Sequence, residues 1–122
     1  MAQSTILVIE DNPDNLELVK FLLEKAGFNV IGETDGKKGL AALQEKRPDL
    51  ILLDMSIPEI DGWSLAKQIK SDPQTASILV VALTAHTLPG DRKRALDAGC
   101  DGFISKPLDV PNFVSQVSSY LR

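Results

Sequence analysis

The sequence predicts an α/β fold in which helices cover both faces of an open, doubly wound sheet of five parallel strands. Two observations lead to this prediction. Short, continuous apolar runs, typical of strands buried on both faces, alternate along the chain with segments of helical periodicity. This alternation uses all 122 residues, a common size for one domain, so we expect residues 1–122 to form a single domain without an attached effector domain.

The first strand-helix unit has well-marked boundaries. A strand is expected over residues 6–9, where aliphatic residues follow one another without interruption. Asn12 and Pro13 then give a capping side chain followed by proline at the first helical position, and Gly27 is a natural residue to end the helix. Between them, five apolar residues recur at helical spacing and predict the buried face: Leu16, Val19, Leu22, Leu23 and Ala26.

The remaining four units follow the same pattern. Their boundaries are set by capping aspartates, by glycines and by prolines that end helices. Because the strands are solidly apolar and helices separate them, we expect parallel pairing with right-handed crossovers. We predict strands over residues 30–31, 50–53, 78–83 and 102–105, and helices over residues 36–47, 62–71, 89–99 and 110–121.

The composition excludes several classes of protein. A net charge of −4 argues against binding to a nucleic-acid backbone, so we expect no direct nucleic-acid partner. The longest apolar run, residues 78–83, is far shorter than the roughly 20 residues of a membrane-spanning helix, so no membrane association is expected. The single cysteine, Cys100, cannot form an internal disulfide and the first residues do not resemble a signal peptide, which together favour the reducing cytoplasm.

Polar residues stand at the carboxyl ends of the predicted strands. Glu10 and Asp11 follow the first strand, Asp54 the third, Thr84 the fourth and Lys106 the fifth. Ligands of doubly wound sheets bind at this edge, and crowded carboxylates must hold either protons or a cation. Oxygen ligands without histidine or cysteine favour a hard ion such as Mg²⁺. The alternative, that strand ends are polar simply because loops are polar, explains one such residue better than it explains all five.

Nucleotide binding is a poor match to the glycines. Gly32, Gly36 and Gly39 do not form the dinucleotide-binding fingerprint, and the residues after Gly36 lack the spacing and the hydroxyl residue of a P-loop. The acidic turn after the first strand would also repel a phosphate that arrived without a metal.

Four groups of residues carry a resemblance to a known family. They are Glu10-Asp11, Asp54 with Pro58 and Asp61-Gly62, Thr84-Ala85, and Lys106-Pro107. Together they resemble the receiver domain of two-component response regulators, and the resemblance covers essentially the whole chain. The segment over residues 84–109, with residues 98–103 before the lysine, looks most like stand-alone regulators of the DivK kind and receivers of hybrid kinases. The resemblance implies the flavodoxin-like strand order 2-1-3-4-5.

The resemblance also implies a chemical role for each acidic residue. Asp54 would accept a phosphoryl group from the phosphohistidine of a histidine kinase or histidine phosphotransfer protein. Asp11 would ligate Mg²⁺ directly and Glu10 through a water, while Asp54 and the backbone carbonyl of Ser56 would complete the protein ligands. Glu10 stands where a shorter aspartate is common.

Three further residues are implied to transmit the modification. Lys106 would offset the charge of the phosphoryl oxygens, with a cis peptide bond to Pro107 aiming it inward, and Thr84 would donate its hydroxyl to a phosphoryl oxygen. Phe103 stands at the switch position of the fifth strand, where some relatives have tyrosine, although a plain core phenylalanine is the alternative interpretation.

Two other features leave alternatives open. The basic run over residues 92–94 is either a patch that docks a partner or a solvated helix face. Trp63, close to Asp54 in sequence, either covers the site or packs in the core.

The leading hypothesis is therefore a phosphorylation-operated switch that signals by binding a downstream protein or by phosphorelay. It would catalyse its own phosphorylation and dephosphorylation without being a metabolic enzyme. The alternative is a haloacid dehalogenase-like, Mg²⁺-dependent phosphatase, which also uses an aspartate nucleophile at a strand end. Such an enzyme needs a second acid two residues after the nucleophile, where this chain has Ser56.

Overall fold

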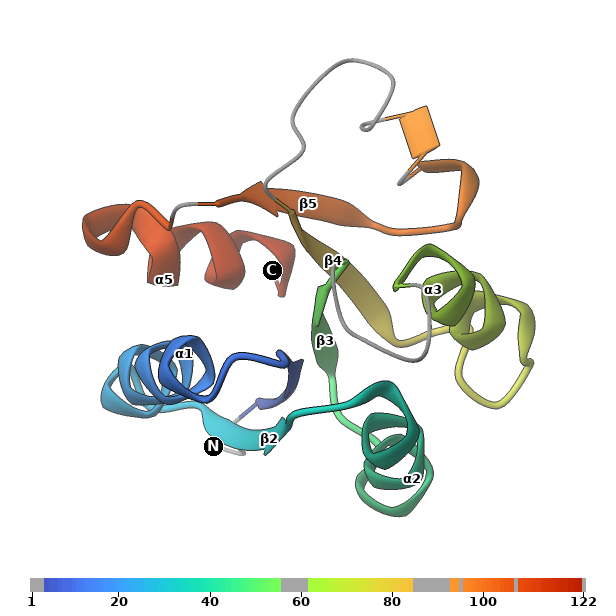
Figure 1. The fold of residues 1–122 in the computed structure, drawn as a ribbon, viewed down its shortest axis with the longest axis horizontal. Coiled ribbons are helices and arrows are strands. Elements are labelled where there is room, and N and C mark those ends of the chain that lie inside the picture. The colour runs from blue at the N-terminus through green and yellow to red at the C-terminus, as the bar shows by residue number, and fades with distance from the viewer. Residues whose placement is uncertain (1–3, 56–61, 85–92, 95, 107, 122) are drawn as a thin grey trace.

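The computed structural model describes residues 4–55, 62–84, 93–94, 96–106 and 108–121. These residues form a five-stranded parallel sheet in the order β2-β1-β3-β4-β5 (Figure 1), which confirms the predicted fold class and strand order. The elements are β1 (Thr5–Ile9), α1 (Pro13–Lys25), β2 (Asn29–Glu33), α2 (Gly36–Lys46), β3 (Leu50–Asp54), α3 (Gly62–Ser71), β4 (Leu79–Thr84), β5 (Gly102–Ser105) and α5 (Val110–Tyr120).

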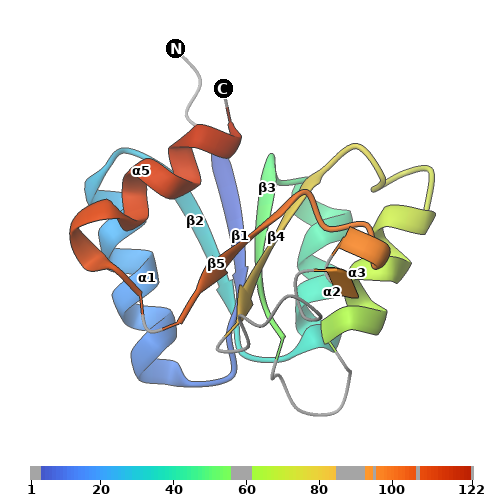
Figure 2. The same cartoon turned by 90° about the horizontal axis from the view of Figure 1, so that it is seen from above.

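Helices cover both faces of the sheet. α1 and α5 lie on one face, and α2 and α3 lie on the other (Figures 1 and 2). Residues of β1 alternate between two buried apolar clusters, with Ile6 and Val8 facing α1 and α5 and Leu7 and Ile9 facing α2 and α3. The continuous apolar run of this strand is therefore explained by burial on both sides.

Local capping sets several helix ends where the sequence predicts them. The side chain of Asn12 accepts from two backbone amides of the first turn of α1, and Asp35 accepts from the amide of Lys38 in α2. Gly27 has a φ of +100°, which glycine adopts without steric cost, and the chain turns there toward β2.

Two boundaries differ from the prediction. β4 begins at Leu79, because the amide of Ile78 donates to the carbonyl of Thr75 in the preceding turn instead of joining the sheet. β2 is longer than the two apolar residues that predict it, since parallel pairing with β1 continues from Asn29 to Glu33. Edge strands need fewer apolar residues than central ones.

The helix expected over residues 89–99 lies partly outside the described residues. Residues 93–94 and 96–97 are helical, and we call these the 93–97 segment. Gly99, with a φ of +90°, ends the turn as predicted. No helix in the described part of the chain is long and apolar enough to cross a membrane.

Candidate functional site

The sheet order reverses beside β1, so the carboxyl ends of β1 and β3 flank the crevice where ligands bind in folds of this class. Backbone hydrogen bonds continue the strand pairing one residue beyond the strands and fix the residues that follow. The amide of Glu10 donates to the carbonyl of Glu33 at 3.0 Å, and the amide of Lys106 donates to the carbonyl of Thr84 at 2.8 Å. Asp54 is itself the last residue of β3. The sheet thus holds these positions rigidly.

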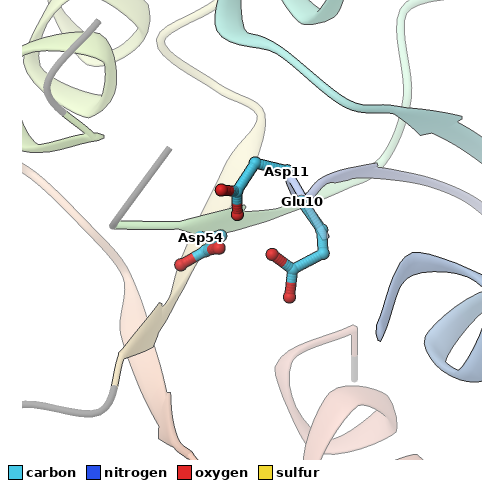
Figure 3. A group of neighbouring side chains, drawn as sticks. All are labelled: Glu10, Asp11 and Asp54. Carbon is cyan, nitrogen blue, oxygen red and sulfur yellow. The ribbon is translucent and has the colours of Figure 1, made fainter. Parts of the chain in front are cut away.

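Three carboxylates converge in this crevice (Figure 3). Glu10, Asp11 and Asp54 each offer an oxygen, and these oxygens lie within 4.8 Å of one another. Glu10 and Asp54 are each only 1% exposed, whereas Asp11 is exposed. Two of the three charges are therefore withdrawn from water, and the third borders it.

Lys106 joins the same cluster. Its Nζ lies 3.0 Å from Oε1 of Glu10 and 3.2 Å from Oδ2 of Asp54, and its side chain is 21% exposed. One ammonium group therefore faces two buried carboxylates at ion-pair distance. We call Glu10, Asp11, Asp54 and Lys106 the carboxyl-end cluster.

The ionisation of the cluster reflects its excess of carboxylates. Burial and a hydrogen bond with Asp54 raise the pKa of Glu10 from 4.5 to about 7, although the hydrogen bond and charge of Lys106 oppose this. Burial lowers the pKa of Lys106, but its hydrogen bond to Glu10 and the charges of Asp54 and Glu10 outweigh this effect, so the pKa rises. Near neutral pH, Glu10 thus carries a proton in part of the molecules and Lys106 stays charged.

The donor set fits a hard divalent cation. All three candidate ligands offer oxygen, two are fixed in the protein and one borders solvent, and Mg²⁺ prefers a few carboxylates while keeping several of its waters. A cation there would replace the proton on Glu10 and relieve the repulsion among the three carboxylates.

Thr84 and Phe103 lie where the sequence predicts them. Thr84 is buried at the end of β4, paired in register with Ser105 of β5. Phe103 is half-buried, packs on the cluster beneath α2 and α3, and its carbonyl accepts a 3.5 Å hydrogen bond from the hydroxyl of Tyr120. The backbone at Phe103 is therefore tied to α5 while its ring lies on the other face of the sheet.

A groove of about 440 Å³, which the sequence analysis missed, opens directly beside Glu10 and Lys106. Leu18 and Val110, which are 41% and 45% exposed, line it together with Leu108. The sequence held one signal of this groove, since Leu18 lies off the apolar face predicted for the first helix.

Some predicted features fall outside the described residues. These are the Ser56 carbonyl ligand, the peptide bond from Lys106 to Pro107, and Arg92 of the basic run. Trp63 packs against the cluster beneath α2 and α3, as one of its two interpretations predicts, and its ring also contacts Arg94.

Comparison with known proteins identifies the family. Residues 6–118 match the model of the response regulator receiver domain. This chain belongs to that family. A polar-differentiation response regulator, DivK, from Brucella anthropi is 38% identical over 117 residues, covering 96% of this chain and 95% of the relative. DivK of Brucella ovis shows the same identity and coverage.

Solved structures agree with the assignment. The receiver domain of a signal transduction histidine kinase from Syntrophus aciditrophicus is 36% identical, with a TM-score of 0.88 and coverage of 97% of this chain and 89% of that one. The receiver of a Pseudomonas aeruginosa sensor histidine kinase is 30% identical, with a TM-score of 0.87 over 98% of both chains, and has a magnesium ion coordinated in its active-site cleft. The receiver domain is thus a component of phosphorylation-based two-component signalling, and the phosphatase alternative is not favoured.

Proposed function

We propose that Asp54 accepts a phosphoryl group from a phosphohistidine and that the modified receiver then binds a downstream protein or passes the group on. The observation that carries this proposal is the carboxyl-end cluster, in which the buried Asp54 meets Glu10 and Asp11 within 4.8 Å and Lys106 at 3.2 Å. Phosphoryl transfer depends chiefly on positioning and electrostatic stabilisation, which a nucleophilic carboxylate, a cation-binding pair of acids and an ammonium group at one sheet edge can supply.

In the transfer, a carboxylate oxygen of Asp54 attacks phosphorus. The new oxygen–phosphorus bond forms as the phosphorus–nitrogen bond breaks, and the electron pair of that bond returns to the imidazole of the donor. The product is an acyl phosphate. Lys106, held 3.2 Å from Oδ2 of Asp54, is placed to pair with the oxygens of the transferred group, and because the cluster supplies this positioning we infer that the receiver catalyses its own phosphorylation and dephosphorylation.

Glu10, Asp11 and Asp54 would hold Mg²⁺, with the Ser56 carbonyl as the further ligand implied by family resemblance. When bound, the ion neutralises charge on the transferring phosphoryl oxygens. Support comes from the donor set and from the Pseudomonas receiver, which has magnesium in its active-site cleft. The exposed position of Asp11 leaves one side of the cluster open to water and to an incoming phosphodonor.

Thr84 and Phe103 are the proposed switch residues. Thr84 is buried at the end of β4, next to the β3 strand end that carries Asp54, and we infer that its hydroxyl moves toward a modified Asp54. Such a movement would free space beside β5, where the ring of Phe103 packs. The signal then leaves as a rearrangement of side chains at this end of β4 and β5.

We propose that the phosphodonor, a histidine kinase or histidine phosphotransfer protein, approaches over the groove beside Glu10 and Lys106. The exposed apolar side chains of Leu18 and Val110 offer contact area there. We place the exchange in the cytoplasm, where the free, buried Cys100 stays reduced.

Intact mass measurement tests the proposal. Incubation with acetyl phosphate and Mg²⁺ should add one phosphoryl group to the wild-type protein and to Asp101→Asn, which removes a carboxylate remote from the cluster, but none to Asp54→Asn. Unchanged mass of the wild-type protein, or equal modification of Asp54→Asn, would overturn the assignment. Steady release of phosphate from ester substrates would instead indicate a phosphatase.

A further inference from the structure

A contact between an arginine and the only tryptophan joins two elements that are distant in sequence. The guanidinium carbon of Arg94 lies 4.9 Å from the centre of the Trp63 ring, within the range of a cation–π interaction. The other such contact described, Lys25 with Phe21 at 5.9 Å, stays within α1. Among the cation–π contacts of the described residues, only the contact between Arg94 and Trp63 therefore joins two separate elements.

The tryptophan is anchored on both sides. Its ring packs against the buried cluster beneath α2 and α3. The preceding residue, Gly62, lies so close to the end of β3 that a Cβ atom there would be 2.7 Å from Cα of Met55 and 3.2 Å from the carbonyl oxygen of Asp54. The backbone at Asp54 and the first turn of α3 are therefore in close contact, so a change in one can reach the other.

The arginine, by contrast, stands on an exposed segment. The four described residues of the 93–97 segment are all exposed, and the buried Ala98 follows them. This segment lies on the same side of the sheet as α3 (Figure 2). The described side chains of the segment bury little apolar area, so the contact of Arg94 with the Trp63 ring contributes to fixing its position.

We propose that the Arg94–Trp63 contact is a coupling device that makes the position of the 93–97 segment follow the state of Asp54. The contact transmits displacement of the Gly62 backbone to the segment, independently of the route through Thr84 and Phe103. This inference rests on the proposed phosphorylation of Asp54. The exposed surface of the segment, including Leu96, thereby becomes dependent on phosphorylation.

The first experiment examines the unphosphorylated protein. Arg94→Gln should change the emission of Trp63 and speed amide exchange at Ala98 and Gly99, whose amides donate to residues of the segment, by about two- to fivefold. Lys93→Gln removes the same charge from the adjacent exposed position and should change neither measurement. Equal behaviour of the two variants would overturn the contact as a restraint.

The second experiment adds acetyl phosphate and Mg²⁺ and follows intact mass in parallel. In the wild-type protein and Lys93→Gln, phosphorylation should change exchange at Ala98 and Gly99, and this change should fall to less than about half in Arg94→Gln. A gain in mass with the same exchange change in all three proteins would overturn the coupling alone. A wild-type protein that gains no mass would overturn the proposed function, and the coupling with it.

Discussion

Two lysine–carboxylate clusters lie at opposite ends of the sheet and differ in their balance of charge. At the amino ends of β4 and β5, Nζ of Lys70 lies 3.1 Å from Oδ2 of Asp101 and donates to the carbonyl of Ile78 at 3.0 Å, while the amide of Val80 donates to Oδ2 of Asp101 at 2.8 Å. We call these four residues the amino-end cluster. Each charge in it has an opposite charge and a backbone partner.

The carboxyl-end cluster has the reverse composition, because Lys106 must serve both Glu10 and Asp54 while Asp11 adds a third carboxylate. The excess negative charge of this cluster must be balanced by a proton or a bound cation, in agreement with the raised pKa of Glu10. The comparison teaches that a lysine–carboxylate pair whose charges match supports the fold, whereas a buried cluster with an excess of carboxylates indicates a site built to bind something.

Removing the lysine from each cluster should separate the two roles most clearly. Lys106→Ala should remain folded, because the carboxylates can take up protons, yet lose the response of the amide chemical shifts of β4 and β5 to phosphorylation. Lys70→Ala should keep that response in full, at some cost in stability. NMR spectra with and without acetyl phosphate measure both. A full response in Lys106→Ala would show that the two lysines do not differ in this way.

Asp101→Ala should lower the free energy of unfolding by about 1–3 kcal/mol, because the ammonium of Lys70 and the amide of Val80 both lose their acceptor. Asp97→Ala, at an exposed helical position, is the matched control and should change stability by less than about 0.5 kcal/mol. Urea denaturation gives both values. Equal effects of the two substitutions would contradict a structural role for the amino-end cluster.

Asp11→Ala should weaken Mg²⁺ binding by at least about tenfold, since it removes one of three oxygen ligands. Asp101→Ala should bind the ion as the wild-type protein does, because the amino-end cluster already balances its own charge. Calorimetric titration at pH 8 compares the two. Equal affinity of Asp11→Ala and the wild-type protein would mean that the metal site is misassigned.

Much of this architecture was predictable because it depends on local patterns. Buried strands show as apolar runs, and a residue such as Asp54, directly after such a run, must emerge at the sheet edge. The convergence of Glu10, Asp54, Thr84 and Lys106 followed from parallel pairing alone. The specific roles of these residues came from the family resemblance, because spacing alone predicts only an acidic, cation-binding edge.

The features that were missed depend on tertiary packing. Nothing in the local sequence pairs Lys70 with Asp101, 31 residues away, or brings Arg94 over the ring of Trp63. Val110 shares the helical spacing of the buried residues in α5, yet it is exposed, because it is the first residue of the helix and lines the groove. Periodicity along one helix does not show how far a neighbouring element covers it.

The smallest expected difference between the two clusters is that the carboxyl-end cluster makes stability depend on pH. The pKa of Glu10 is raised in the folded protein, so the folded state binds more protons than the unfolded chain between about pH 4.5 and pH 7. The contribution of this group to stability is therefore fully present below pH 4.5 and is lost as the pH rises to about 7. In metal-free protein we expect a loss on the order of 1 kcal/mol over this range.

Glu10→Gln supplies the test, because an uncharged amide of the same shape imitates the protonated acid at every pH. Urea denaturation without metal between pH 5 and 8 should show the variant gaining stability relative to the wild-type protein as the pH rises. Glu17→Gln, which removes a carboxyl group from the exposed surface of α1, should give a profile parallel to the wild type. Saturating Mg²⁺ should stabilise the wild-type protein at pH 8, and the Glu10→Gln substitution should abolish most of that gain, because the ion binds the same carboxylates whose repulsion lowers stability. If the wild-type and Glu10→Gln profiles run parallel, the carboxyl-end cluster holds no such repulsion.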